Sequence, residues 1–173
     1  MLKPIIIDAL NAQVATESFA SANYLAMASW CDREGLDGCA NFLYRQSDEE
    51  RVHMLKIFHY INEMDGHALS PAVAQATIEY PSVRNLFENV LAHEQKVTAS
   101  INNLVNLCYE EKDHATHSFL QWYVDEQREE EALMRHILDK IRLIGDTAGA
   151  GYWIDLELEK INAAEAKAAV VKK

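Results

Sequence analysis

Carboxylate and imidazole side chains, which bind metal ions, recur at helical spacing in this 173-residue sequence. The stretch "EERVH" at 49–53 places Glu50 and His53 three residues apart, and this spacing puts both side chains on one face of a helix. A helix that turned this face inward would bury both groups. Because a buried carboxylate without a countercharge is costly, the pattern predicts a cation beside them.

Three other stretches have a seam, a row of mostly apolar residues that recur at alternating steps of three and four and would face inward on a helix. Polar residues interrupt each of these seams. These residues are Glu17 in the first stretch, Glu94 in the third, and Gln127 with Glu130 in the fourth. Glu50 follows Glu17 by 33 residues, and Gln127 follows Glu94 by the same interval. The repeat predicts two copies of one helical hairpin that carries ligands.

A single polar residue in one seam more often forms a hydrogen bond that sets the register between packed helices. Four helices with polar residues at matched spacings favour a metal site instead. No lysine or arginine occupies these seams, so four glutamates and one histidine in a single layer predict two divalent cations. Oxygen donors with one imidazole suit iron, manganese or zinc better than a metal that prefers sulfur ligands.

Apolar residues that recur at alternating steps of three and four predict four long helices and a shorter fifth one. The signals at their ends are Ser82 and Asp113 as N-caps, a glycine in "MDG" at 64–66 that stops the second helix, and Gly145 after the fourth. The expected ranges are 5–33, 36–65, 83–111, 114–144 and about 152–165.

The connections between these helices predict the topology. Turns of a few residues make the first and second helices antiparallel, and likewise the third and fourth. The segment 67–82 can reach roughly 50 Å at about 3.3 Å per residue, which exceeds a helix of roughly 43 Å at 1.5 Å per residue. It can therefore cross the whole bundle, which brings all four polar positions to one level. We expect an all-α, single domain over 1–173, with its four-helix bundle at about 5–144.

The composition excludes several classes of protein. The net charge of −11 argues against nucleic acid as a partner and is compatible with cations. No apolar run approaches the roughly 20 residues of a membrane span, so no membrane partner is expected. Three widely spaced cysteines fit a reduced cytoplasmic location better than a disulfide framework.

At these residues the chain resembles the ferritins, and more narrowly the prokaryotic non-haem ferritins, from Met1 to about Ile161. Ferritin-like di-iron bundles carry Glu-x-x-His on two helices. Here "EERVH" keeps that form, whereas the second copy reads "EQREEE" at 126–131, with Gln127 for glutamate and Glu130 for histidine. This substitution, within "FLQWYVDEQREEE" at 119–131, is the ferritin pattern.

The resemblance implies a homo-oligomeric cage of 24 subunits that oxidises Fe(II) with dioxygen or hydrogen peroxide and stores the ferric mineral inside. It implies that Glu17, Glu50 and His53 hold the first iron of a di-iron centre. Glu50 would bridge to a second iron held by Glu94 and Glu130, with Gln127 beside it. It also implies a role for Tyr24, as a hydrogen-bond donor to Glu94 or as an electron donor, although a core tyrosine is equally compatible. Three more residues match a third iron site, with a solvated acidic face as the equal alternative: Glu49, Glu126 and Glu129.

The alternative function is a di-iron oxidoreductase or peroxidase of the rubrerythrin or bacterioferritin type. The missing histidine in the second copy argues against it. Bacterioferritins would place a haem-binding methionine directly after the bridging glutamate, and Arg51 stands there, so no haem is expected. A DNA-protecting mini-ferritin is disfavoured by the acidic charge and by the predicted fifth helix.

Overall fold

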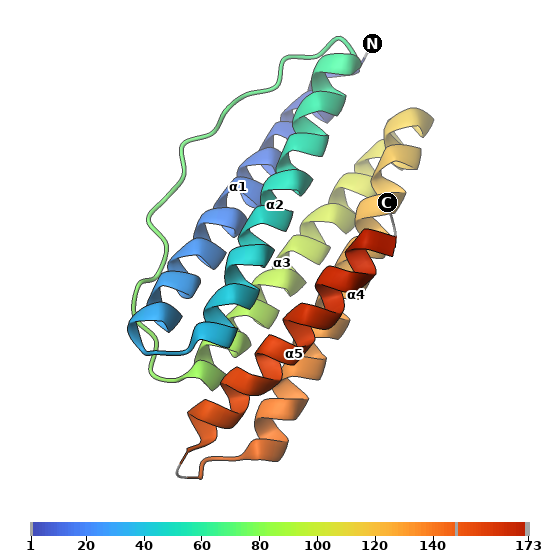
Figure 1. Ribbon diagram of the computed structural model, residues 1–173. Coiled ribbons are helices and arrows are strands. Elements are labelled where there is room, and N and C mark those ends of the chain that lie inside the picture. Colours follow the sequence, from blue (N-terminus) through green and yellow to red (C-terminus); the bar gives the residue numbers. More distant parts are fainter. Residues whose placement is uncertain (1, 148, 172–173) are drawn as a thin grey trace.

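The computed structural model describes residues 2–147 and 149–171. Within these residues it contains five α-helices and no strand, which confirms the predicted fold class. Four long helices form a bundle, and the fifth lies against it (Figure 1). The ends of the predicted 1–173 domain, residues 1, 172 and 173, lie outside the described residues. The helices are α1 (Pro4–Arg33), α2 (Asp37–Glu63), α3 (Val83–Glu110), α4 (His114–Ile144) and α5 (Ala150–Val171).

The segment between α2 and α3 runs the length of the bundle, as predicted, so that α2 and α3 point in the same direction (Figure 1). It follows α1. The Asn11 side chain accepts a hydrogen bond from Leu69 N–H at 2.8 Å and donates to the carbonyl of His67 at 3.0 Å. Near the other end, Arg33 forms an ion pair with Glu79 at 2.6 Å. Anchors at both ends hold this long connection against the helix.

The predicted helix caps are confirmed at Ser82 and Asp113, whose side chains accept from the backbone N–H of Asn85 and Thr116. The prediction for the end of α2 was partly wrong. The residue with left-handed backbone there is Asp65, with φ of 62°, rather than Gly66. Gly66 is needed for space, because its N–H bonds to the Ile61 carbonyl and a Cβ would lie 2.9 Å from that oxygen.

Two apolar clusters fill the bundle on either side of its polar layer. One includes Met27, Phe42 and Phe87, and the other includes Leu10 and Ile57. The polar residues of all four seams lie between them in sequence and are buried. The apolar clusters can therefore hold the bundle together while the layer between them serves another purpose. No helix in the described part of the chain is long and apolar enough to cross a membrane.

Helix α5 is longer than the predicted 152–165 and packs along α2 and α4 (Figure 1). Its Ile154 and Leu158 side chains are buried. The Asp155 carboxylate accepts a hydrogen bond from the Cys39 N–H at 2.8 Å. Gly38 lies so close to the Asp155 carbonyl that any side chain there would collide with it. The fifth helix is thus fitted closely to the first turns of α2.

Candidate metal centre

The structure brings Glu17, Glu50 and His53 together in the middle of the bundle. One ligand atom from each of these three buried residues lies within 4.8 Å of the other two. The His53 Nδ1 atom lies 3.5 Å from Glu50 Oε2. Glu17 comes from α1, and the other two come from one face of α2, as the three-residue spacing predicts.

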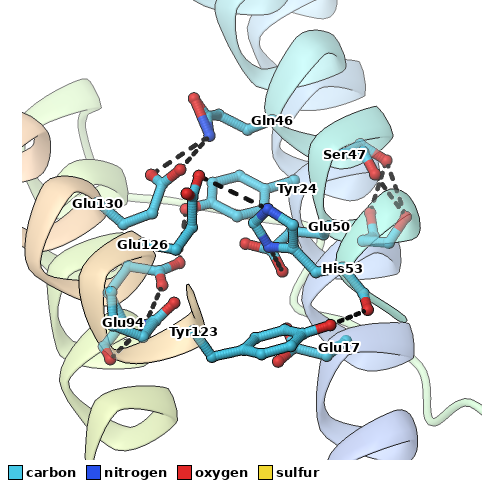
Figure 2. A network of polar contacts seen from close by, with 12 residues as sticks. Glu17, Tyr24, Gln46, Ser47, Glu50, His53, Glu94, Tyr123, Glu126 and Glu130 are labelled. Carbon is cyan, nitrogen blue, oxygen red and sulfur yellow. Dashed lines mark hydrogen bonds and ion pairs between the residues drawn. The ribbon is translucent and has the colours of Figure 1, made fainter. Parts of the chain in front are cut away.

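Across the layer, α3 and α4 present Glu94 and Glu130, both of which are buried (Figure 2). Gln127 is buried beside them, and its Nε2 donates to Glu94 Oε2 at 3.1 Å. Among the described residues, the group of Glu17, Glu50 and His53 is the only set of three or more metal-binding side chains whose ligand atoms lie within 4.8 Å of one another. In the α3–α4 half Gln127 therefore acts as a donor to a neighbouring carboxylate.

Tyr24 lies at the same level and donates its hydroxyl to Glu94 Oε1 at 2.7 Å (Figure 2). It is almost completely buried. Burial, and then the charge of Glu94, raise the pKa of the Tyr24 hydroxyl well above its usual value. The phenol therefore stays protonated and holds one oxygen of Glu94 in place.

Several residues that orient the ligands had no assigned role in the sequence. Gln13 donates to Glu17 Oε1 at 2.8 Å, and Ser100 donates to the Gln13 amide oxygen at 2.6 Å. Gln46 Nε2 lies 3.4 Å from both oxygens of Glu130. Gln13 and Gln46 each precede a glutamate of the layer by four residues, Glu17 and Glu50, and this spacing could have identified them.

Three carboxyl groups in the layer have pKa values that disfavour their charged forms. Burial, followed by the charge of Glu50, raises the pKa of Glu17. Burial, followed by the charge of Glu94, raises the pKa of both Glu50 and Glu130. Removing a carboxylate from water and placing it beside another one both disfavour ionisation. A divalent cation would reverse both effects.

The donor set fits such a cation. Glu17 Oε2 is buried and has no hydrogen-bond partner among the described residues. A buried acceptor without a partner costs free energy unless something outside the protein chain satisfies it. Carboxylate oxygens with one imidazole are ligands for iron, manganese or zinc.

The three residues matched to a third iron site lie at the edge of the layer. The side chains of Glu49 and Glu126 are 33% and 27% exposed, and Glu129 is exposed. Glu126 Oε1 lies 3.8 Å from His53 Nε2, whereas Glu49 is paired with Arg45 at 2.6 Å. The structure therefore brings Glu126 next to the buried layer and pairs Glu49 with the guanidinium group of Arg45.

Comparisons with known proteins agree with this architecture. A family model described as a ferritin-like domain matches residues 7–144. A bacterial non-heme ferritin from Campylobacter jejuni is 42% identical over 161 residues, which cover 93% of this chain and 96% of that protein. A probable bacterial non-heme ferritin-like protein from Haemophilus influenzae is 40% identical, with 94% and 98% covered.

Solved structures give the same result. A crystal structure described as an open-pore ferritin from the archaeon Archaeoglobus fulgidus superposes with a TM-score of 0.89 at 40% identity. The alignment covers 92% of this chain and 98% of that one. The family model, the relatives and the shared fold lead to one conclusion: the chain belongs to the ferritin family.

Proposed function

We propose that this ferritin oxidises Fe(II) at the buried layer and stores the ferric product as a mineral inside a multi-subunit cage. Family membership supports iron storage, and relatives along nearly the whole chain have the name non-heme ferritin. The observation that carries the ferroxidase activity is the group of Glu17, Glu50 and His53, which faces Glu94 and Glu130 across a buried layer.

In this proposal two Fe(II) ions are substrates that bind side by side. Glu17 and His53 hold the first ion, Glu94 and Glu130 hold the second, and Glu50 bridges them. One electron from each ion reduces dioxygen to hydrogen peroxide with uptake of two protons. Alternatively, the two electrons and two protons reduce one hydrogen peroxide to two water molecules. The apolar clusters on both sides of the layer limit access of water, which strengthens the attraction between the carboxylates and the ions.

The remaining residues of the layer have supporting roles in this proposal. Tyr24 orients Glu94 through its hydroxyl. Gln127 gives Glu94 a second donor. Glu49, Glu126 and Glu129 form an outer position through which iron passes. We also propose an assembly of 24 subunits in the cytoplasm, where three free, buried cysteines would stay reduced.

A di-iron oxidoreductase that cycles iron without storing it is the second candidate. A site built for a permanent metal pair would be expected to furnish both positions alike. Here Gln127 and Glu130 stand where the repeat would place glutamate and histidine, so the second position has no imidazole. This asymmetry favours a site that releases iron, as storage requires.

The test is oxidation of about two Fe(II) per subunit, followed by absorbance and oxygen uptake after air is admitted to an anaerobic sample. We expect Glu50→Ala and His53→Ala to assemble normally, because the apolar clusters remain, and to oxidise iron at least about tenfold more slowly. Gel filtration and circular dichroism check the assembly. Parental initial rates in both variants would show that oxidation happens elsewhere.

A further inference from the structure

Arg45 lies on α2, one turn before Glu49, and its guanidinium contacts three groups. Its Nε donates to Asn162 Oδ1 on α5 at 2.7 Å. Its Nη1 donates to Glu49 Oε1 at 2.6 Å, and its Nη2 donates to Gln46 Oε1 at 3.3 Å. The Arg45 side chain is only 19% exposed. Because guanidinium donors have a fixed planar arrangement, acceptors on two helices determine the orientation of the whole group.

The contact with Gln46 determines which end of that amide faces Glu130. Gln46 is fully buried, with its oxygen toward Arg45 and its nitrogen 3.4 Å from both Glu130 oxygens (Figure 2). Arginine has donors and no acceptor, so only the amide oxygen can bond to it. The amide nitrogen is thereby left to face Glu130, to which it can donate.

We propose that Arg45, held by Asn162 of α5, is a positioning residue that keeps Glu130 oriented for Fe(II). Helix α5 then takes part in setting the affinity of the second iron position, although it carries none of the assigned ligands. This inference rests on the proposed function, because Glu130 binds Fe(II) only under that function. Without the arginine the Gln46 amide can rotate, and Glu130 loses a fixed donor.

The effect is confined to one half of the layer. Glu17 has its own donor, Gln13, which is oriented by Ser100. Neither of these two hydrogen bonds involves α5. A change at Asn162 should therefore weaken the second iron position and leave the first unchanged, whereas a general loosening of the fold would affect both.

The experiment is anaerobic calorimetric titration of the assembled full-length protein with Fe(II). The second position has no imidazole, so we expect it to give the weaker of two binding events. Asn162→Ala and Gln46→Leu should weaken that event by about tenfold, the low end of the range for residues that orient metal ligands. The stronger event should not change. Asn162→Asp keeps an oxygen acceptor for Arg45 and should restore the parental affinity.

Asp155→Ala is the matched control. It removes another hydrogen bond between α5 and α2, the one to the Cys39 N–H, without touching Arg45. We expect it to lower the thermal unfolding midpoint and to leave both Fe(II) affinities unchanged. If Asn162→Ala binds as the parent does, or if Asp155→Ala weakens the second event equally, the positioning role is wrong. Glu50→Ala should abolish Fe(II) binding that the parent shows. If it does not, the proposed function itself fails, and the role of Arg45 fails with it.

Discussion

Single residues in the layer are oriented by neutral donors. The donors are Gln13 for Glu17, Tyr24 and Gln127 for Glu94, and Gln46 for Glu130. Amides and a phenol fix the direction of a carboxylate without cancelling its charge. The arrangement therefore sets the shape of the layer in advance and leaves the ionisation of its carboxyl groups to a bound cation, which would favour their charged forms.

The same layer predicts an unusual pH dependence for the metal-free protein. The pKa of the Glu17 carboxyl is raised above 4.5 in the folded state, chiefly by burial. A raised pKa contributes stability that is fully present below the unfolded-state pKa and is lost as the pH rises through the folded-state pKa. Glu17→Gln should therefore match the parent in thermal unfolding midpoint near pH 4.5 and exceed it increasingly toward pH 8.

Glu88→Gln is the control for this comparison, because Glu88 is exposed on α3, away from the layer. Its midpoint should track the parent at every pH. Added Zn²⁺ should stabilise the parent more than Glu17→Gln, since only the parent keeps the full ligand set. A difference between Glu17→Gln and the parent that does not change with pH would contradict the assignment of Glu17 as a carboxyl disfavoured by burial.

The asymmetry between the halves gives a second prediction at this scale. The double variant Gln127→Glu with Glu130→His restores the internal repeat and adds an imidazole to the second position. Sites that mix nitrogen and oxygen hold Fe(II) more tightly than sites with oxygen alone. We expect the double variant to retain its iron pair and to form mineral more slowly than the parent. Mineral growth is measured by absorbance over repeated iron additions.

His53→Ala serves as the reference for slow mineral growth caused by lost oxidation, because it should bind less iron than the parent. The double variant should instead bind two irons per subunit and release them slowly. If the double variant forms mineral as fast as the parent, the asymmetry is not what makes this protein a store.

At the scale of helices, the sequence predicted α1 to α4 well, and the polar positions in their seams are buried as expected. Their apolar seams are regular, so the polar residues that interrupt them, such as Glu94, stand out and fall at one level once the crossover is recognised. The outer partners were harder to predict. Gln13 lies beside the seam rather than in it, because the buried stripe of α1 is wider than a two-position repeat.

Helix α5 could not be placed from the sequence, because its position depends on a long-range fit. Tyr152 and Trp153 are large and apolar, yet they are exposed, so hydrophobic residues alone do not identify its inner face. The face of α5 that packs on α2 is instead set by Gly38 of α2. Because Gly38 has no side chain, the Asp155 carbonyl of α5 can approach it closely. Nothing in the local sequence of either helix predicts this contact.

Gly38→Ala tests that fit. Alanine favours a helix over glycine by about 1 kcal/mol, but its Cβ would collide with backbone that cannot yield. If α5 moves away, Ile154 and Leu158 lose burial worth about 1.5–3 kcal/mol each. We therefore expect a lower thermal midpoint and faster proteolytic cleavage between α4 and α5. Asp48→Asn, a change at an exposed position on α2, should alter neither, and equal cleavage in both variants would contradict the fit.

At the scale of the whole molecule, part of the net charge of −11 lies beside the buried layer. Glu49, Glu126 and Glu129 lie on α2 and α4 at the edge of the buried layer. A cluster of like charges raises the local concentration of counter-ions and speeds their arrival. The acidic composition can therefore serve iron uptake, because the attracted cations arrive beside the ligands.

If the charge serves uptake, salt should slow it. Exposed charges more than about 8–10 Å apart are screened at 0.1–0.15 M ionic strength, whereas ligands in direct contact with an ion are not. We expect the rate of Fe(II) uptake, measured by stopped-flow absorbance, to fall between low salt and 0.15 M sodium chloride, with the final number of irons bound unchanged.

The variant Glu126→Gln with Glu129→Gln should take up Fe(II) more slowly at low salt, and its rate should depend less on salt. The exposed pair Glu63→Gln with Glu110→Gln, at the ends of α2 and α3, reduces the negative charge equally and should behave as the parent does. Equal slowing by both pairs would assign the effect to total charge, and an uptake rate independent of salt would remove the electrostatic role altogether.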